Sequence, residues 1–423
     1  MRPNILYIIA HDLGRHLRCY GQRTVESPAL DRLAAQGVIF TNHFAAATPC
    51  SPSRGCIMTG RYAHTNGLVG LVNHGWDMPA RERTIVDELN DAGTHTVHFG
   101  LQHERRDHEA NRYADCRGGS ALADDVAARV CEFLRTDAKS LQPFYLNAGT
   151  FEVHLPFDRE VYEPADPAEV DVPRFLPDNP DVRTELARFH GSIKHLDAAV
   201  GEILRTLDET GLAENTAVIF TTDHGMAFPR AKSTLFDAGI GTALIIRAPG
   251  AALRGPCEAL LSNIDLTPTL LDMLGREIPS RMQGRSFWPL LTGRDEAYQP
   301  RTEVFSEKNY HNRYDPTRCV RTERYKYIRS FAPAPAIPLP RDIAESIAAR
   351  ELLPGAREPR APKELYDLVD DPHERRNLVR SLNHTEVLAD LRHRLDRWMR
   401  DTADFLLTGD APTPPPTQPL DDE

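Results

Sequence analysis

The sequence lacks a long hydrophobic run. The run nearest its start, residues 5–10, ends at His11 and Asp12. This length is too short for a membrane span or for the hydrophobic part of a signal peptide, and no other window approaches the length of a span. We therefore interpret residues 5–10 as a buried strand, and we expect a cytoplasmic protein with no membrane partner.

Paired cysteines are also missing. The seven cysteines are an odd number, and no two of them form a Cys-x-x-Cys pair. Disulfide frameworks and structural zinc sites both depend on such regular spacing, so the sequence argues against both. The cysteines are Cys19, Cys50, Cys56, Cys116, Cys131, Cys257 and Cys319.

Dense runs of lysine and arginine are a third absence. The chain has 50 Lys and Arg against 61 Asp and Glu, which gives a formal net charge of −11. A nucleic-acid partner needs a basic face that neutralises phosphates, so the charge argues against one. An anionic small molecule stays compatible with the charge if a local group of cations and a metal binds it against the overall field.

The sequence does contain an alternation of strand-like and helix-like segments. A hydrophobic content of 41% and a charged content of 26% are those of an ordinary globular protein. Apolar β-rich runs alternate with helical periodicity, which predicts an α/β fold with a large, mostly parallel sheet sandwiched between helices. The predicted strands cover residues 5–10, 144–148, 217–221 and 243–246, and the predicted helices cover residues 29–36, 85–92, 122–134 and 193–210.

The pattern changes after a further predicted helix at residues 264–274. Beyond it, short strand-like runs and one amphipathic helix indicate an α+β region with a short antiparallel sheet. These strands are predicted at residues 304–307, 319–321 and 325–330, and the helix at residues 387–398.

Three parts of the chain follow from this change. We expect a large domain over residues 1–295 and a smaller α+β C-terminal domain over residues 296–405. Residues 406–423 are rich in proline and acidic side chains, which predicts a loose tail or an arm over a neighbouring surface.

Two polar pairs lie directly behind predicted strands. His11-Asp12 follows residues 5–10, and Asp223-His224 follows the strand at residues 217–221. An isolated Asp-His-Gly after a strand is usually a turn. In an open α/β sheet, however, binding sites form at the carboxyl ends of the strands, so these two pairs predict a site at one edge of the sheet.

The most specific motif is Cys50-Ser51-Pro52-Ser53-Arg54, which continues to Thr59-Gly60-Arg61. A single cysteine near a proline is by itself most often structural. The whole run, however, resembles the Cys-x-Pro-Ser-Arg signature of the sulfatases, in which a formylglycine-generating enzyme oxidises the cysteine to formylglycine. The resemblance implies that Cys50 is modified in this way and acts as the nucleophile.

The resemblance extends along most of the chain, because matching segments occur in order from residue 2 to residue 378. The chain therefore resembles the formylglycine-dependent sulfatases of the alkaline phosphatase superfamily, which implies an alkaline-phosphatase-like fold with residues 1–295 as the catalytic domain. The runs CSPSR and TNGLVGL and the Phe-Pro after residue 227 are most similar to the heparan N-sulfatase (sulfamidase) type. The matching segments are residues 2–14, 27–40, 221–225, 232–239, 264–274, 321–328 and 364–378.

The resemblance implies one divalent metal ion and a set of ligands for it. Asp12, Asp223 and the modified Cys50 stand at the places of family ligands, and His224 stands where many sulfatases carry Asn. The metal ionises one hydroxyl of the hydrated formylglycine, which attacks sulfur, and the other hydroxyl then expels sulfate. A serine in this place would depend on water for the last step.

Four further side chains are implied to act on the nucleophile or the substrate. Arg54 would hold the formylglycine and the charged oxygens through its rigid fork, and Lys232 would neutralise sulfate as a point charge. His103 aligns with a family histidine that contacts the hydroxyl of the nucleophile. His154 aligns with one that approaches the leaving-group oxygen as a general acid.

Two positions depart from the family pattern. His11 stands where the first residue is usually Asp, and it is a ligand, a donor to a ligand or a substrate contact. Calcium, which the resemblance implies, prefers oxygen ligands, whereas the imidazoles of His11 and His224 favour manganese or zinc. Leu101 stands where most sulfatases carry lysine. The neighbouring groups that could replace that charge are His98, Arg105 and Arg106.

Hydrolysis of a sulfate ester or sulfamate of a small molecule or sugar is the main hypothesis, and two alternatives stay open. Phosphonate monoester and phosphodiester hydrolases of the same superfamily also use formylglycine and an Asp-His metal pair. A degenerate member that binds anions without turnover is the other alternative, motivated by His11 and Leu101. The expected partners are the anionic substrate and the formylglycine-generating enzyme, and a homo-oligomer is left open.

Overall fold

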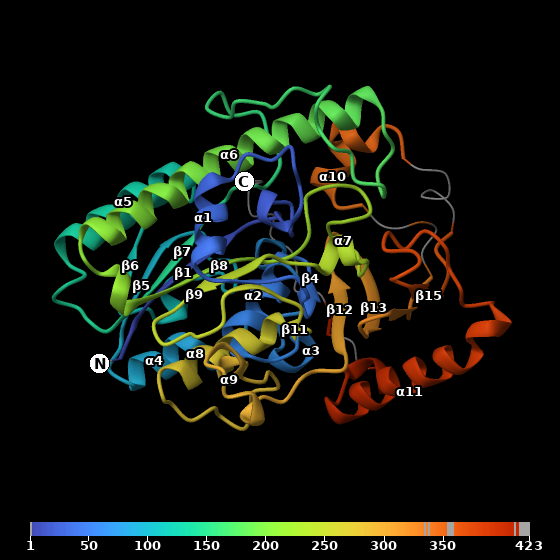
Figure 1. Cartoon of the computed structure of the whole chain (residues 1–423). Coiled ribbons are helices and arrows are strands. Elements are labelled where there is room, and N and C mark those ends of the chain that lie inside the picture. The colour runs from blue at the N-terminus through green and yellow to red at the C-terminus, as the bar shows by residue number, and fades with distance from the viewer. Residues whose placement is uncertain (1, 334–335, 337–338, 353–358, 410–411, 414–423) are drawn as a thin grey trace.

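A large sheet with helices on both faces forms the greater part of the structure, and a smaller sheet lies beside it (Figure 1). The computed structural model describes residues 2–333, 336, 339–352, 359–409 and 412–413. The predicted architecture, a large sheet flanked by helices with a separate, mainly antiparallel sheet in the C-terminal part, is confirmed.

Within the described residues, the large sheet has eight strands in the order β10-β2-β9-β8-β1-β7-β5-β6. Neighbouring strands run parallel except at β9, which is antiparallel to both of its neighbours. The sheet is therefore mostly parallel, as predicted. The strands are β1 (Asn4–Ala10), β2 (Val38–Phe40), β5 (His95–Gly100), β6 (Asp115–Arg117), β7 (Phe144–Gly149), β8 (Thr216–Thr222), β9 (Leu244–Arg247) and β10 (Gly255–Cys257).

Strand β1 lies in the middle of this sheet and is buried along its whole length. Its side chains alternate between two hydrophobic clusters, since successive residues of a strand point to opposite faces. Leu6 and Ile8 belong to the first cluster, while Ile5 and Tyr7 belong to the second. A strand covered on both faces reads as a continuous apolar run, which is why residues 5–10 could be recognised.

Helices cover each face of the large sheet. On one face lie α1 (Pro28–Gln36), α5 (Ala123–Thr136) and α6 (Pro180–Glu209). On the other face α4 (Ile85–Asp91), α8 (Leu266–Met273) and α9 (Trp288–Leu291) bury their apolar side chains. Helix α2 (Cys50–Thr59), α3 (Ala63–Asn66) and α7 (Asp237–Ile240) lie toward the smaller sheet (Figure 1).

The smaller sheet has the strand order β15-β14-β13-β12-β4 among the described residues. Its antiparallel part was predicted, whereas β4, which comes from the N-terminal part of the chain and pairs in parallel with β12, was not. Helix α11 (Thr385–Asp401) packs against β13 and β14. The strands are β4 (Ala47–Thr48), β12 (Val304–Tyr310), β13 (Tyr314–Arg321), β14 (Tyr325–Ser330) and β15 (Lys363–Asp367).

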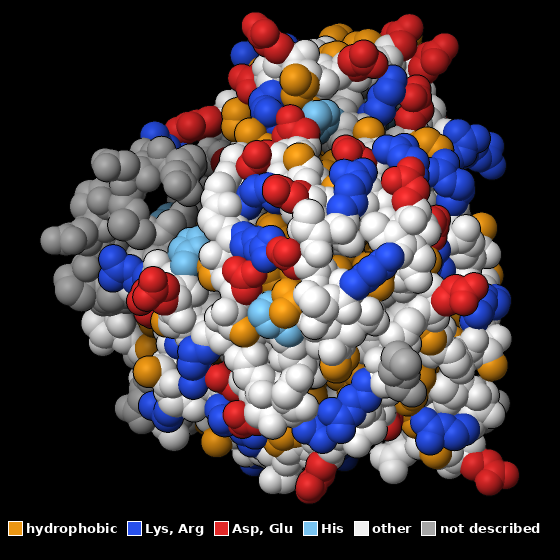
Figure 2. Space-filling model, turned by 90° about the vertical axis from the view of Figure 1, so that its left-hand side faces the viewer, with side chains coloured by type: hydrophobic (Ala, Val, Ile, Leu, Met, Phe, Trp, Pro, Cys, Tyr) orange, Lys and Arg blue, Asp and Glu red, His pale blue; other side chains and the backbone are white. Residues whose placement is uncertain are grey.

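The predicted division of the chain at residue 295 stays a prediction, although β4 shows that the smaller sheet draws on both sides of it. Most of the predicted tail, residues 406–423, lies outside the described residues. No helix in the described part of the chain has the length and apolar character needed to cross a bilayer. On the face shown in Figure 2, basic and acidic side chains are interspersed.

Candidate active site

Four neighbouring strands of the large sheet end at one edge, and each is followed by a residue that the sequence singled out. The strands are β8, β1, β7 and β5, which run parallel to one another. Their carboxyl ends therefore meet, and the loops behind them carry polar side chains to a common place. These side chains are His11 and Asp12 after β1, Asp223 and His224 after β8, His154 after β7 and His103 after β5.

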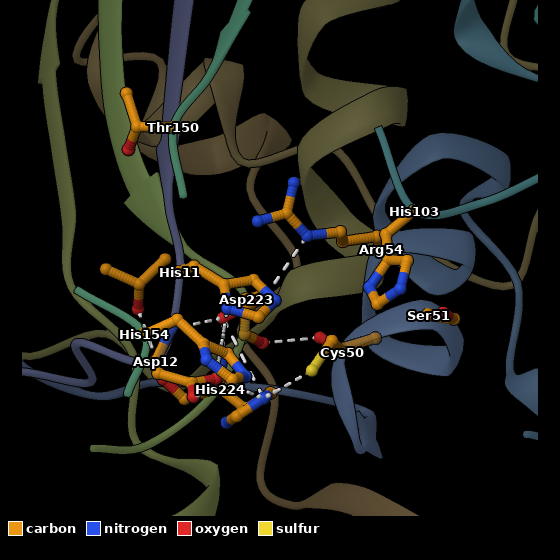
Figure 3. Close-up of polar contacts among 12 residues, drawn as sticks. His11, Asp12, Cys50, Ser51, Arg54, His103, Thr150, His154, Asp223 and His224 are labelled. Carbon is orange, nitrogen blue, oxygen red and sulfur yellow. Dashed lines mark hydrogen bonds and ion pairs between the residues drawn. The ribbon is translucent and has the colours of Figure 1, made fainter. Parts of the chain in front are cut away.

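Helix α2 brings the sulfur of Cys50 to this edge. Cys50 is the first residue of the helix and only 3% exposed. Its Sγ lies 3.2 Å from Nε2 of His224 (Figure 3). Burial raises the pKa of the Cys50 thiol, although the neighbouring His224 opposes this. The unmodified thiol is thus a poor nucleophile at neutral pH.

Arg54 lies one turn further along α2, on the same side as Cys50 (Figure 3). Its Nε donates a hydrogen bond of 3.1 Å to Oδ2 of Asp223. The two terminal nitrogens of the guanidinium are buried and have no hydrogen-bond partner among the described residues. A guanidinium held at Nε with both terminal nitrogens free can bind an anion with two parallel hydrogen bonds.

A cluster of ligand-type atoms lies next to Cys50. One atom each from His11, Asp12, Cys50 and Asp223 fall within 4.8 Å of one another. Both ring nitrogens of His11 are buried without a hydrogen-bond partner in the described part of the chain. Burial lowers the pKa of His11 well below its usual value, so the ring is neutral, as a metal ligand must be.

His224 borders this cluster. Its Nε2 lies 3.0 Å from Oδ1 of Asp12, and its ring is fully buried. Gly225 lets the loop pass close to α7, because a Cβ at this position would lie 1.9 Å from the carbonyl oxygen of Ala238. The loop that carries Asp223 and His224 is therefore fixed by packing against α7.

Lys232 lies between two carboxylates. Its Nζ is 2.5 Å from Oδ2 of Asp12 and 2.6 Å from Oδ2 of Asp342. Burial alone would lower the pKa of Lys232, but the two carboxylates outweigh burial and raise it. Conversely, burial favours the neutral acid of Asp12, but Lys232 holds the pKa of Asp12 well below its usual range.

Two histidines complete the group of predicted residues. His154 Nε2 lies 2.9 Å from Nζ of Lys232 and 3.6 Å from Oδ2 of Asp12. His103 has a ring nitrogen within 4.8 Å of His11 and Cys50, and burial lowers the pKa of His103 to about 3. The structure thus brings all the predicted site residues to one place.

Asp342 is a member of this group that sequence reasoning missed. It lies on α10 (Arg341–Glu345), and its carboxylate contacts Lys232 and lies 3.5 Å from Nε2 of His154. No motif surrounds Asp342 in the sequence, and its contact with Lys232 joins residues 110 positions apart. Only the folded chain reveals this contact.

Comparison with known proteins identifies the group of proteins to which this site belongs. A family model described as "Sulfatase" matches residues 3–276, which is more than half of the chain. The chain belongs to the sulfatase family. A second model, "N-sulphoglucosamine sulphohydrolase, C-terminal", matches residues 224–337 of this sulfatase. Like the family as a whole, this protein is a sulfuric ester hydrolase.

Curated relatives cover nearly the whole chain. An ulvan-active sulfatase of Formosa agariphila is 28% identical over 95% of this chain and 76% of its own length. The N-sulphoglucosamine sulphohydrolase of Homo sapiens is 28% identical over 95% of this chain and 91% of its own length. Both alignments extend across the large and the smaller sheet.

Solved structures share the fold of this sulfatase. A protein in complex with its substrate D-glucosamine-2-N,6-O-disulfate superposes with a TM-score of 0.76 at 18% identity, over 96% of this chain and 99% of the other. A phosphonate monoester hydrolase of Silicibacter pomeroyi superposes with a TM-score of 0.73 at 23% identity, over 96% and 97%. The alkaline-phosphatase-like fold that the resemblance implied is thereby confirmed.

Leu101, where most sulfatases carry lysine, follows the end of β5. Two of the three groups that could replace the missing charge have other partners. His98 Nε2 lies 3.0 Å from the carbonyl oxygen of Gly100, and Arg105 donates to the carbonyl oxygens of Met78 and Glu82. These bonds hold His98 and Arg105 to the backbone, and Arg106 is exposed.

Proposed function

We propose that this sulfatase hydrolyses a sulfate ester or sulfamate on a sugar, with residue 50 as the nucleophile after oxidation of Cys50 to formylglycine. The observation that carries the proposal is the position of Cys50. Its Sγ lies against His224 and within 4.8 Å of ligand atoms of His11, Asp12 and Asp223. When oxidised and hydrated, residue 50 supplies two hydroxyls, one to attack sulfur and one to drive release of sulfate.

The residues around Cys50 suit a divalent metal ion. Two carboxylates, a neutral imidazole and residue 50 converge, and both nitrogens of that imidazole lack a hydrogen-bond partner among the described residues. Asp12, Asp223, residue 50 and His224 would hold the ion, with His11 as a further donor. Bound there, it would lower the pKa of a hydroxyl on residue 50. The two carboxylates suit calcium, whereas His11 and His224 suit manganese or zinc.

Arg54 and Lys232 provide the positive charge for the sulfate group. The free terminal nitrogens of Arg54 can bind two oxygens at once. Lys232 is 2% exposed, so its charge acts in a site largely closed to water, where it stabilises developing negative charge strongly. In the structure Asp342 occupies the outer side of the Lys232 ammonium. A sulfate oxygen that approaches Lys232 would therefore have to share the ammonium with Asp342 or displace it.

His154 is placed to act on the leaving group. Its side chain is 21% exposed, while Asp12, on the other side of Lys232, is fully buried. His154 therefore lies at the open side of the site, where the sugar oxygen or nitrogen must leave. Its Nε2 lies 2.9 Å from the Lys232 ammonium, which can only donate, so this nitrogen would act as a general acid once it has gained a proton. His103 lies on the nucleophile's side and would accept its proton during release.

The relatives support a sugar as substrate. The human relative is named an N-sulphoglucosamine sulphohydrolase, and the C-terminal model of that name matches residues 224–337. One structural neighbour was solved with a disulfated glucosamine. Both point to a sugar that carries N-sulfate or O-sulfate. The phosphonate monoester hydrolase neighbour makes phosphorus esters the alternative to be tested.

The test is a substrate panel combined with variants of Cys50. The purified protein is offered sugar O-sulfates, N-sulfoglucosamine, an aryl sulfate, a phosphonate monoester and a phosphodiester, and mass spectrometry reports the state of residue 50. We expect sulfate release to dominate, Cys50→Ala to abolish it, and Cys50→Ser to give at most one turnover. Full metal-dependent turnover by Cys50→Ala would disprove the nucleophile. Dominant turnover of the phosphorus esters would disprove the substrate class.

A further inference from the structure

A cavity of about 260 Å³ lies beside the proposed sulfate site. Two of its lining residues are close in the chain to residues of that site. Ser233, which lines the cavity, follows Lys232 in the chain, and Pro340, also in the lining, lies two residues before Asp342. Because Lys232 and Asp342 are in contact, the two walls meet at the sulfate site. The other lining residues are Lys308, His311, Asn312, Arg313 and Leu339.

The cavity has an excess of positive charge. Lys308 and Arg313 line it, and none of the described lining residues is acidic. The nearby Asp315 binds Lys308 at 2.8 Å, but it also binds Arg360 at 3.1 Å. One carboxylate is therefore shared between two cations. The residue Arg313 is exposed, and its side chain makes no hydrogen bond or ion pair with the described residues.

Neutral polar groups in the wall are held in fixed positions. Ser233 Oγ lies 2.9 Å from Nδ1 of His311, and the carbonyl oxygen of His311 lies 3.1 Å from Nδ1 of His74. Ser233 has a φ of 65°, in the left-handed region that few residues other than glycine adopt. The wall next to Lys232 is thus preorganised, so a ligand would lose less free energy in ordering these groups when it binds.

We propose that this cavity is a substrate subsite that binds a second anionic group, a carboxylate or a further sulfate, on the sugar that carries the scissile sulfate. The inference rests on the proposed function. Pockets for whole small ligands have volumes of about 300–1,000 Å³. At about 260 Å³ the cavity suits a charged substituent or one sugar ring. Two anionic groups on one molecule would then contact Arg54 and Lys232 on one side and Arg313 and Lys308 on the other.

Binding to the full-length Cys50→Ala protein tests the inference independently of turnover. Calorimetry compares N-sulfoglucosamine with glucosamine-2-N,6-O-disulfate, and a monosulfated glucose with a monosulfated glucuronate. We expect at least one dianion of these pairs to bind about tenfold more tightly than its monoanionic partner, since charge-assisted hydrogen bonds to Arg313 add to its affinity. The first pair reports a second sulfate, and the second pair a carboxylate.

Substitution of Arg313 then locates the effect. In Cys50→Ala, the further change Arg313→Ala should reduce the preference for the dianion about tenfold, and Arg313→Glu should reduce it more. Arg294→Ala serves as a matched control, because Arg294 is also exposed and its side chain bonds within the described chain only to Thr292. Equal affinities for both members of each pair, or a preference that survives Arg313→Glu, would overturn the inference. Sulfate release by the parent protein, which retains Cys50, tests the proposed function separately.

Discussion

The guanidinium of Arg54 makes one hydrogen bond with the described residues, although it carries five N–H donors. Its side chain is 1% exposed, and both terminal nitrogens lack a partner among the described residues. An unpaired buried donor costs about 1–3 kcal/mol, and more when it is charged. An anion bound between Arg54 and residue 50 would accept hydrogen bonds from both nitrogens and so remove this cost. The position of Arg54 is therefore an argument for an anionic substrate that is independent of any motif.

Lys232→Ala should impair the reaction strongly. We expect kcat/KM for the best sulfate substrate to fall by roughly 30- to 1,000-fold, as for removal of one donor to a developing anion. Lys232→Arg keeps the charge and should recover part of the rate. Steady-state kinetics measures both variants. Because Lys232 also contacts Asp12, the metal content of each variant is measured at the same time, and an unchanged kcat/KM in Lys232→Ala would remove this residue from the site.

Residues beside strand ends or within family motifs could be predicted from the sequence, whereas residues outside both could not. His11, Asp12, Asp223 and His224 directly follow buried strands, so the pattern and the family resemblance identified them together. Asp342 lies on a five-residue helix with no motif around it. The same holds for Arg313, which only the pairing of β12 with β13 brings near Ser233.

At the scale of elements, the start of α1 is stabilised by a residue of α6. Ser27 precedes α1 but makes no capping hydrogen bond with its side chain. Instead, the carboxylate of Asp197 accepts hydrogen bonds from the backbone nitrogens of Ala29 at 2.9 Å and Leu30 at 2.8 Å. The first-turn N–H groups that a cap normally satisfies are thus bound by another helix, and the two helices are locked together.

Asp197→Ala should destabilise the fold without direct effect on the site. We expect the free energy of unfolding to fall by about 1–2 kcal/mol, the usual cost of losing an N-terminal cap. Urea denaturation followed by circular dichroism measures it. Asp208→Ala is the matched control, since Asp208 is an exposed residue of the same helix. Equal stability of the two variants would show that the capping role is wrong.

Long buried elements were predicted better than short ones, for a physical reason. The apolar runs of β1, β7 and β8 are buried along their whole length, which leaves a clear pattern in the sequence. The two-residue strand β4 and the His-rich β5 leave none, because their pairing depends on partners far away in the chain. The predicted helix at residues 193–210 proved to begin at Pro180, where Asn179 caps it by accepting a hydrogen bond from the backbone of Val182. Asn-Pro is a start signal that the sequence did contain.

Across the whole molecule, buried ion pairs join the smaller sheet to its surroundings. Glu307 on β12 lies 2.9 Å from Nδ1 of His64 on α3 and 3.5 Å from Arg318 on β13. Arg318 is fully buried and binds both carboxylate oxygens of Asp404, beyond the end of α11. One connected group of polar contacts therefore links α3, the smaller sheet and the segment that follows α11.

Arg318→Met should be one of the more damaging substitutions outside the active site. It leaves the carboxylate of Asp404 buried and unpaired, for which we expect a loss of about 3–5 kcal/mol in unfolding free energy. Thermal unfolding measures the loss. The double variant Arg318→Met/Asp404→Leu also removes the unpaired carboxylate of Asp404 and should recover much of the free energy of unfolding. A single variant as stable as the parent protein would contradict the assigned role.

The pairing of β4 with β12 also affects the order in which parts of the nascent chain can fold. Residues 47 and 48 are paired with residues 307 and 308, and the chain enters α2 at Cys50 immediately afterwards. In the finished fold Cys50 is buried. During synthesis, residue 50 emerges before β12, the strand that pairs with β4, has been made. If Cys50 is oxidised as proposed, the oxidising enzyme would reach it most easily after residue 50 has left the ribosome and before β12 pairs with β4. Under the proposed function, the yield of modified protein would therefore depend on how fast the smaller sheet forms relative to the oxidation of Cys50.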